Sequence, residues 1–80
     1  IYMNNNKMIN FPTEISHMVN VQGLYLNNNE ISFISNEIKN LIYLTKLDLN
    51  YNKIDNLAIE IGELIHLKEL YLNSNKLISL

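Results

Sequence analysis

The stretch LTKLDLNYNKI, residues 44–54, decides the fold, because the same order of residue types appears twice more. It appears as VQGLYLNNNEI at residues 21–31 and as LKELYLNSNKL at residues 67–77, so successive copies start 23 residues apart. A fixed period of this length indicates a repeat protein in which each unit stacks on its neighbours. We therefore expect one solenoid segment.

The apolar residues outside these stretches follow the same 23-residue spacing. Seven columns, each holding equivalent positions of successive copies, are apolar throughout; they begin at Ile1, Met3, Met8, Phe11, Ile15, Met18 and Val21. Aligned apolar columns can stack into one continuous interior. The spacing therefore predicts that the whole chain shares a single core.

Each copy divides into a strand and a return segment. Apolar and polar residues alternate in LYLNN (24–28) and LDLNY (47–51), which is typical of a strand of three to five residues. Such strands can pair in parallel, about 4.8 Å apart. The return segments Asn36–Leu41 and Glu60–Leu67 carry apolar residues three and four apart, which favours short helical or 3-10 turns.

The repeating pattern L-x-x-L-x-L-x-x-N-x-L resembles the leucine-rich repeat family over essentially the whole chain. The second halves FPTEISHM (11–18) and LAIEIGEL (57–64) are similar to the 23-residue intracellular Ras-suppressor-like class. Pro12 and Gly62 keep two marks of that class, whereas Ser35 and Ala58 replace its proline. The resemblance implies an α/β fold: a right-handed, horseshoe-like solenoid segment. It places a short parallel sheet on the concave face and short helical or 3-10 turns on the convex face.

The period sets the expected organisation of residues 1–80 as one leucine-rich repeat segment. It holds a partial repeat at 1–20, full repeats at 21–43 and 44–66, and a partial repeat at 67–80. Terminal repeats of solenoids usually carry polar caps, and none is visible here. We expect either a piece of a longer solenoid or uncapped ends that associate end to end with another copy.

An asparagine closes the strand portion of every copy, in the column Asn6, Asn29, Asn52 and Asn75. Where the chain leaves the strand, its backbone groups lose their ladder partners. An inward side-chain amide offers two donors and an acceptor to those groups. The family resemblance implies that these asparagines stack into a structural ladder.

Composition excludes several classes of protein. The 80 residues hold six lysines, eight acidic residues and no cysteine, with a net charge of −2. Nucleic-acid binders usually show a basic face, which this balance does not provide. The chain has no apolar run long enough for a membrane span, no Asn-x-Ser/Thr sequon, and no signal peptide in Ile1–Lys7. We therefore expect a cytoplasmic protein without nucleic-acid or membrane partners.

The outward strand positions are the expected site for another protein, because solenoids usually bind partners on the concave face. Tyrosine is enriched in interface hot spots, and asparagine supplies adaptable hydrogen bonds. Ordinary cross-strand packing of exposed tyrosines is the alternative interpretation. The expected partner-binding residues are Tyr2, Tyr25, Asn27, Lys46, Asp48, Asn50, Tyr51, Glu69, Tyr71 and Asn73.

Catalytic chemistry is not expected. The two histidines, His17 and His66, fall in different columns without a third ligand, so we predict no metal site. The Glu14, Glu37 and Glu60 column is typical of a solvated edge. Ser16 and His17 lack an orienting acid, and no glycine-rich phosphate loop exists, so we predict no cofactor. A protein-interaction module is therefore favoured. The alternatives are a structural, self-assembling repeat and a targeting arm of a larger signalling or regulatory protein.

Overall fold

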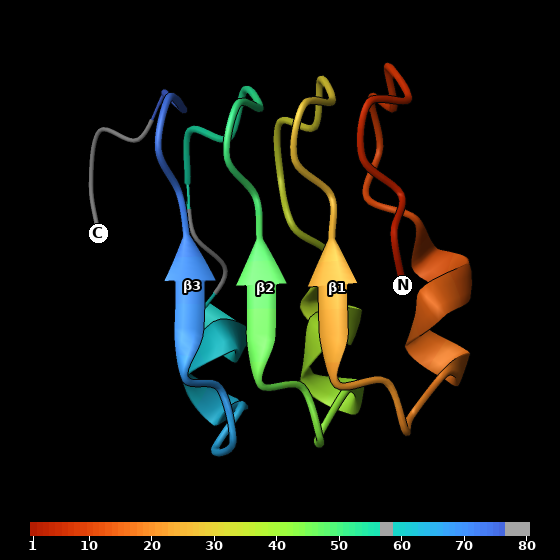
Figure 1. Cartoon of the computed structure of the whole chain (residues 1–80). Coiled ribbons are helices and arrows are strands. Elements are labelled where there is room, and N and C mark those ends of the chain that lie inside the picture. The colour runs from red at the N-terminus through yellow and green to blue at the C-terminus, as the bar shows by residue number, and fades with distance from the viewer. Residues whose placement is uncertain (57–58, 77–80) are drawn as a thin grey trace.

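Short strands and 3-10 helices alternate along residues 1–56 and 59–76, which the computed structural model describes (Figure 1). The described elements are, in order, η1 (Thr13–His17), β1 (Gly23–Tyr25), η2 (Asn36–Asn40), β2 (Lys46–Asp48), η3 (Ile59–Glu63) and β3 (Glu69–Tyr71). The strands form one parallel sheet in the order β1-β2-β3, and the helices lie behind it. This arrangement confirms the predicted solenoid of parallel strands and 3-10 turns.

The strands pair with a register of one repeat. Leu24 lies opposite Leu47, and Leu47 lies opposite Leu70. The regular strands are three residues long, at the short end of the expected range. Hydrogen bonding nevertheless continues past them: Leu26 N donates to Asp48 O at 2.9 Å and Asn28 N to Asn50 O at 2.9 Å. Equivalent residues of successive coils therefore lie side by side through the asparagine column.

The core is made from the predicted apolar columns. Its buried members are Phe11, Ile15, Leu24, Leu26, Ile31, Ile34, Ile38, Leu41, Leu44, Leu47, Leu49, Ile54 and Leu64. Partly buried residues pack against them: Met3, Met8, Val21, Ile61, Leu67, Leu70 and Leu72. Leu57, Ala58, Leu77 and Leu80, to which several expectations applied, lie outside the described residues. Burial of aliphatic side chains in successive coils is the main stabilising contribution.

One of the two predicted return segments is a shorter helix than the sequence suggested. The segment predicted at Asn36–Leu41 is η2, which matches closely, whereas η3 ends at Glu63, before Leu67. Leu41 N and Leu64 N close the two helices with bonds to Ile38 O and Ile61 O, both at 3.1 Å. Bonds of this i→i+3 type rarely continue for long runs. The chain then turns toward the next strand, and none of the described helices is long enough to cross a membrane.

Candidate protein-binding surface

The strand face is the side of the sheet that points away from the helices. Its residues come from β1 to β3 and the positions directly after them, with Tyr2 joined to Tyr25 by an isolated parallel bridge. Two rows of side chains cross it: Gly23, Lys46 and Glu69 in the first, and Tyr2, Tyr25, Asp48 and Tyr71 in the second. Neighbouring parallel strands lie about 4.8 Å apart, so side chains within a row can touch.

Tyr2 and Tyr25 stack on each other at one end of this face. Their ring centroids are 4.4 Å apart and the ring planes differ by 7°. The Tyr25 ring also folds back over Gly23, where an added Cβ would lie 3.1 Å from Tyr25 Cε2. The missing side chain of Gly23 therefore leaves room for the ring, which is held against the sheet.

Lys46 occupies the centre of the strand face between two tyrosine rings. Its Nζ lies 5.6 Å from the ring centroid of Tyr25 and 5.8 Å from that of Tyr71. The same ammonium lies 3.9 Å from Glu69 Oε1. A cation at this distance from an aromatic face is attracted by the ring quadrupole. We call Tyr25, Lys46, Glu69 and Tyr71 the lysine-tyrosine cluster.

Tyr71 closes this cluster by donating its hydroxyl hydrogen to Glu69 Oε1 at 2.6 Å. The hydrogen bond to the Glu69 carboxylate raises the pKa of Tyr71 above its ordinary value of 10.0, with smaller contributions from burial and from the negative charges of Glu69 and Asp48. Neutral Tyr71 is the form that can donate this hydrogen bond. The cluster is thus tied together by two cation–π contacts, an ion pair and a charge-assisted hydrogen bond.

The polar residues after the strands serve the backbone as well as the surface. Asp48 Oδ1 accepts from Asn50 N at 3.1 Å, and Asn50 Oδ1 accepts from Asn73 N at 2.7 Å. Asn27 is half-buried and its carbonyl accepts from Asn5 N at 3.1 Å. Tyr51 lies apart from the lysine-tyrosine cluster, in the bend after the strand region, and is 58% exposed. Of the predicted binding residues, the structure therefore brings Tyr25, Lys46, Glu69 and Tyr71 into one cluster and leaves Tyr51 outside it.

The asparagine column connects each coil to the one before it. Asn52 Oδ1 accepts from Ile31 N at 3.1 Å, while Asn52 Nδ2 donates to Leu26 O at 3.0 Å and Leu49 O at 3.1 Å. Asn29 and Asn75 make the equivalent bonds with their preceding coils. Asn6 is exposed and its Nδ2 donates within its own coil. Throughout the described residues, every buried side-chain nitrogen or oxygen has a hydrogen-bond partner.

Charged residues at the ends of the strands form exposed pairs. Lys53 Nζ lies 3.1 Å from Glu30 Oε1 on the neighbouring coil. Exposed pairs of this kind contribute about 0–1 kcal/mol to stability. The described residues hold no group of three or more side chains suited to a metal ion. This exposed pair therefore adds little to the stability of the fold.

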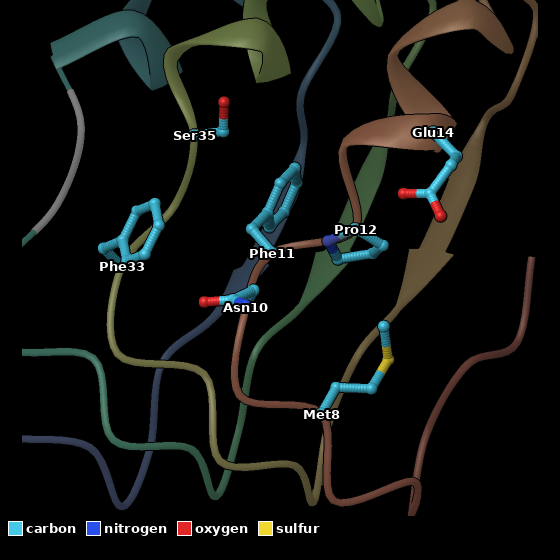
Figure 2. Close-up of a pocket in the computed structure, with 7 residues that line it drawn as sticks. All are labelled: Met8, Asn10, Phe11, Pro12, Glu14, Phe33 and Ser35. Carbon is cyan, nitrogen blue, oxygen red and sulfur yellow. The ribbon is translucent and has the colours of Figure 1, made fainter.

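A hollow of about 530 Å³, which the sequence reasoning missed, lies on the return side of the first two coils (Figure 2). It is lined by Met8, Asn10, Phe11, Pro12, Glu14, Phe33 and Ser35. Asn10 and Phe33 are equivalent positions of successive coils, and their difference in size is a sequence signal for such a hollow. Its buried lining residues, Phe11 and Pro12, bring no polar side chain, and Ser35 Oγ is bonded to Glu37. Nothing buried could therefore orient a small polar ligand.

Stacked coils with a parallel sheet, 3-10 returns and bridging asparagines define a solenoid repeat protein. The Leucine Rich Repeat family model matches residues 20–41 and 43–64, and the chain belongs to the leucine-rich repeat family. Among solved structures, it is similar to a leucine-rich repeat protein of Leptospira interrogans, with a TM-score of 0.90 and 33% identity. That match covers 94% of this chain and 19% of the other, so the chain spans about a fifth of its length. A search of curated proteins gives no match.

Proposed function

We propose that the chain is a non-catalytic module that binds another protein on its strand face. Leucine-rich repeats are generally protein-interaction modules, which supports the class of function. The lysine-tyrosine cluster is the observation that carries the assignment to this face. It joins two aromatic rings, an ammonium and a carboxylate at the centre of the sheet.

Order within the cluster favours binding for an energetic reason. Association costs about 0.5–1.5 kcal/mol for each flexible side chain that it immobilises. Tyr25 is already held over Gly23, and Tyr71 is held by Glu69. The buried leucines beneath the strands keep the backbone in place as well. A partner can therefore contact large amphipathic side chains that are ordered before it arrives.

Removal of the two tyrosines tests the proposal. The chain and its Tyr25→Ala/Tyr71→Ala variant would be used to capture proteins from the cells that express it, with quantification by mass spectrometry. We expect specifically captured protein to fall about 10-fold or more, because hot-spot tyrosines cost at least about 1–2 kcal/mol when truncated. Phe33→Ala is the matched control, since Phe33 is an exposed aromatic residue on the return side of its coil, outside the lysine-tyrosine cluster.

Circular dichroism would show that the double variant keeps its fold. Equal capture by the folded double variant and the wild-type chain would remove the cluster from the binding surface. Tyr51→Ala would separately test the remaining predicted tyrosine, which lies outside the cluster. Loss of capture with Tyr51→Ala alone would place the contact beyond the strands rather than on them.

We also propose the Ras-suppressor-like subclass and a cytoplasmic location. The 23-residue period and the positions of Pro12 and Gly62 support the subclass. The absence of cysteines and of sequons favours the location. Fluorescence microscopy of the tagged full-length protein would test the location, and a signal confined to the cell surface would contradict it.

A further inference from the structure

Exposed aliphatic residues recur in the turns that lead from each helix to the next strand. Val19, Ile42 and Ile65 are 23 residues apart and are 46%, 50% and 84% exposed. Their turns lie side by side along the lower edge of Figure 1. Tyr43 and His66 directly follow Ile42 and Ile65 in these turns and stack on each other, with ring centroids 6.1 Å apart and an interplanar angle of 14°. We call these five residues the apolar edge.

The apolar edge is not needed to fill the core. Leu41, Leu44 and Leu64, which precede or follow these turns, are the residues buried there. Turn positions are usually held by polar residues, glycine or proline, for reasons of solvation and backbone geometry. The five residues expose on the order of 500 Å² per copy, which is within the range of the largest patch on a typical monomer. Because such a patch is often functional, the apolar edge is a candidate interaction surface.

The charges beside the apolar edge indicate what covers it. Glu63 ends η3 on the helix side of Ile65, and Lys68 precedes β3 on its strand side; both are exposed. A two-fold axis along the file would place Ile65 against Ile65 of a second copy. The same operation exchanges the helix side with the strand side. Each Glu63 then faces a Lys68, so the patch is complementary to itself in charge as well as in apolar character.

The other two coils add no repulsion in this arrangement. Asn40 would face Thr45, and His17 would face Gln22, because these residues hold the positions equivalent to Glu63 and Lys68. Asn40 and Thr45, both uncharged, therefore take the positions on either side of Ile42 that Glu63 and Lys68 take beside Ile65. An axis running across the file would instead pair Glu63 with His17 and leave Lys68 facing Gln22. The axis along the file makes the better use of both charges.

We propose that a second copy of this chain docks on the apolar edge and forms a two-fold dimer. Two such patches bury on the order of 1,000 Å², the lower limit for a specific interface, so the dimer is weak, with a Kd in the micromolar range. The strand faces of both copies stay free. Two recognition surfaces held at a fixed separation would strengthen binding to a partner with two matching segments. The dimer itself does not depend on the proposed function.

Sedimentation equilibrium of the 80-residue chain tests the proposal between about 1 μM and 1 mM, a range that brackets a micromolar Kd. We expect the mass to rise from 9.4 kDa toward twice that value and to stop there. Ile42→Lys/Ile65→Lys replaces two exposed side chains and should leave a folded monomer at every concentration. Tyr25→Ala/Tyr71→Ala, on the strand face, is the matched control and should leave the dimer unchanged.

A charge exchange tests the two-fold axis. Glu63→Lys and Lys68→Glu should each weaken the dimer about 10-fold, and the double variant should restore it, because exchanged charges again face one another. A wild-type monomer across the whole range would overturn the proposal. So would assembly that is unaffected by Ile42→Lys/Ile65→Lys, since another surface would then hold the copies together. A mass that grows beyond two copies would indicate end-to-end stacking instead.

Discussion

Two adjacent columns of the solenoid each keep the same backbone conformation from coil to coil, but one has the same residue in every coil and the other does not. The asparagine column holds the same residue in every coil, and Asn29, Asn52 and Asn75 bond into the coil before. The column just before it holds Asn5, Asn28, Tyr51 and Ser74, all with φ between 58° and 61°. The first position depends on a side chain, whereas the second depends on the backbone. A residue type that is the same in every coil therefore indicates a side chain that the fold requires.

The column of Asn5, Asn28, Tyr51 and Ser74 has a left-handed backbone, which makes some residue types less favourable there than others. A non-glycine residue with φ near 60° brings its Cβ close to the following carbonyl, and asparagine is among the residues that tolerate this best. Asn5 and Asn28 fit this requirement, whereas Tyr51 and Ser74 do not. The chain turns out of the strand at this column in each coil. The turn is thus imposed by the coil as a whole.

The largest expected effect comes from the column that depends on its side chain. Asn52→Ala should lower the free energy of unfolding by about 1–3 kcal/mol, because it leaves the buried Ile31 N without its acceptor and removes one of the two side-chain donors to Leu26 O and to Leu49 O. Chemical denaturation would measure the loss. Asn6→Ala is the matched control in the same column: its side chain is exposed, so its loss should be below about 0.5 kcal/mol. Equal losses of stability in Asn52→Ala and Asn6→Ala would contradict the claim that only the asparagines that bond to the preceding coil stabilise the fold.

A smaller effect of opposite sign is expected in the backbone-dependent column. Tyr51→Asn should raise the free energy of unfolding by about 0.5–1 kcal/mol, since φ is 58° and the ring is mostly exposed. The reverse exchange, Asn28→Tyr, should destabilise by a similar amount. Denaturant midpoints of the two variants would be compared with that of the wild type. Destabilisation by Tyr51→Asn would show that the ring contributes packing that outweighs its backbone strain.

The smallest effect is expected on the strand face, where a side chain is bonded only to another exposed side chain. Glu69→Ala should move the pKa of Tyr71 down toward 10.0, because the variant removes the acceptor that favours the neutral phenol. Nuclear magnetic resonance of the ring carbons across an alkaline titration would measure this change. Glu30→Ala, which removes a carboxylate paired with Lys53, should leave the pKa of Tyr71 where it is.

The same contact has a defined dependence on pH. Since the folded-state pKa of Tyr71 is raised, its contribution to stability is complete below about pH 10. The contribution is lost as the pH rises through the raised pKa, when the phenolate can no longer donate to Glu69. The wild-type chain should therefore lose this increment at alkaline pH, and Glu69→Ala should not. An identical pH dependence of both proteins would show that the hydrogen bond is absent in solution.

Much of the architecture could be predicted from the sequence, because a 23-residue period aligns residues that touch. The pairing of Leu24 with Leu47 and Leu70 follows directly from that period. The helix boundaries were less predictable: η3 ends at Glu63, well before the predicted Leu67. Apolar spacing marks which residues face the core, but it does not say where a 3-10 turn gives way to an extended chain.

For the proposed binding surface too, the sequence predicted which residues face outward but not how they contact one another. The rows of the strand face could be listed from the repeat alone, since alternate residues of a strand point outward. The contacts within them could not. Lys46 lies between Tyr25 and Tyr71 because Gly23 leaves space for one ring and Glu69 bonds the other. The apolar edge was also missed, because exposure in a turn depends on which neighbouring residues already fill the core.

The sequence by itself determined the coil: its length, its buried columns and its closing asparagine, since each of these is set by contacts that recur every 23 residues. Only the tertiary structure decided how unlike side chains of neighbouring coils settle against one another. It placed Tyr51 in a left-handed turn, Lys46 between two rings and Ile65 in solvent. Repetition specifies the interior because equivalent positions meet there, whereas the surface is specified by differences between coils, which no period contains.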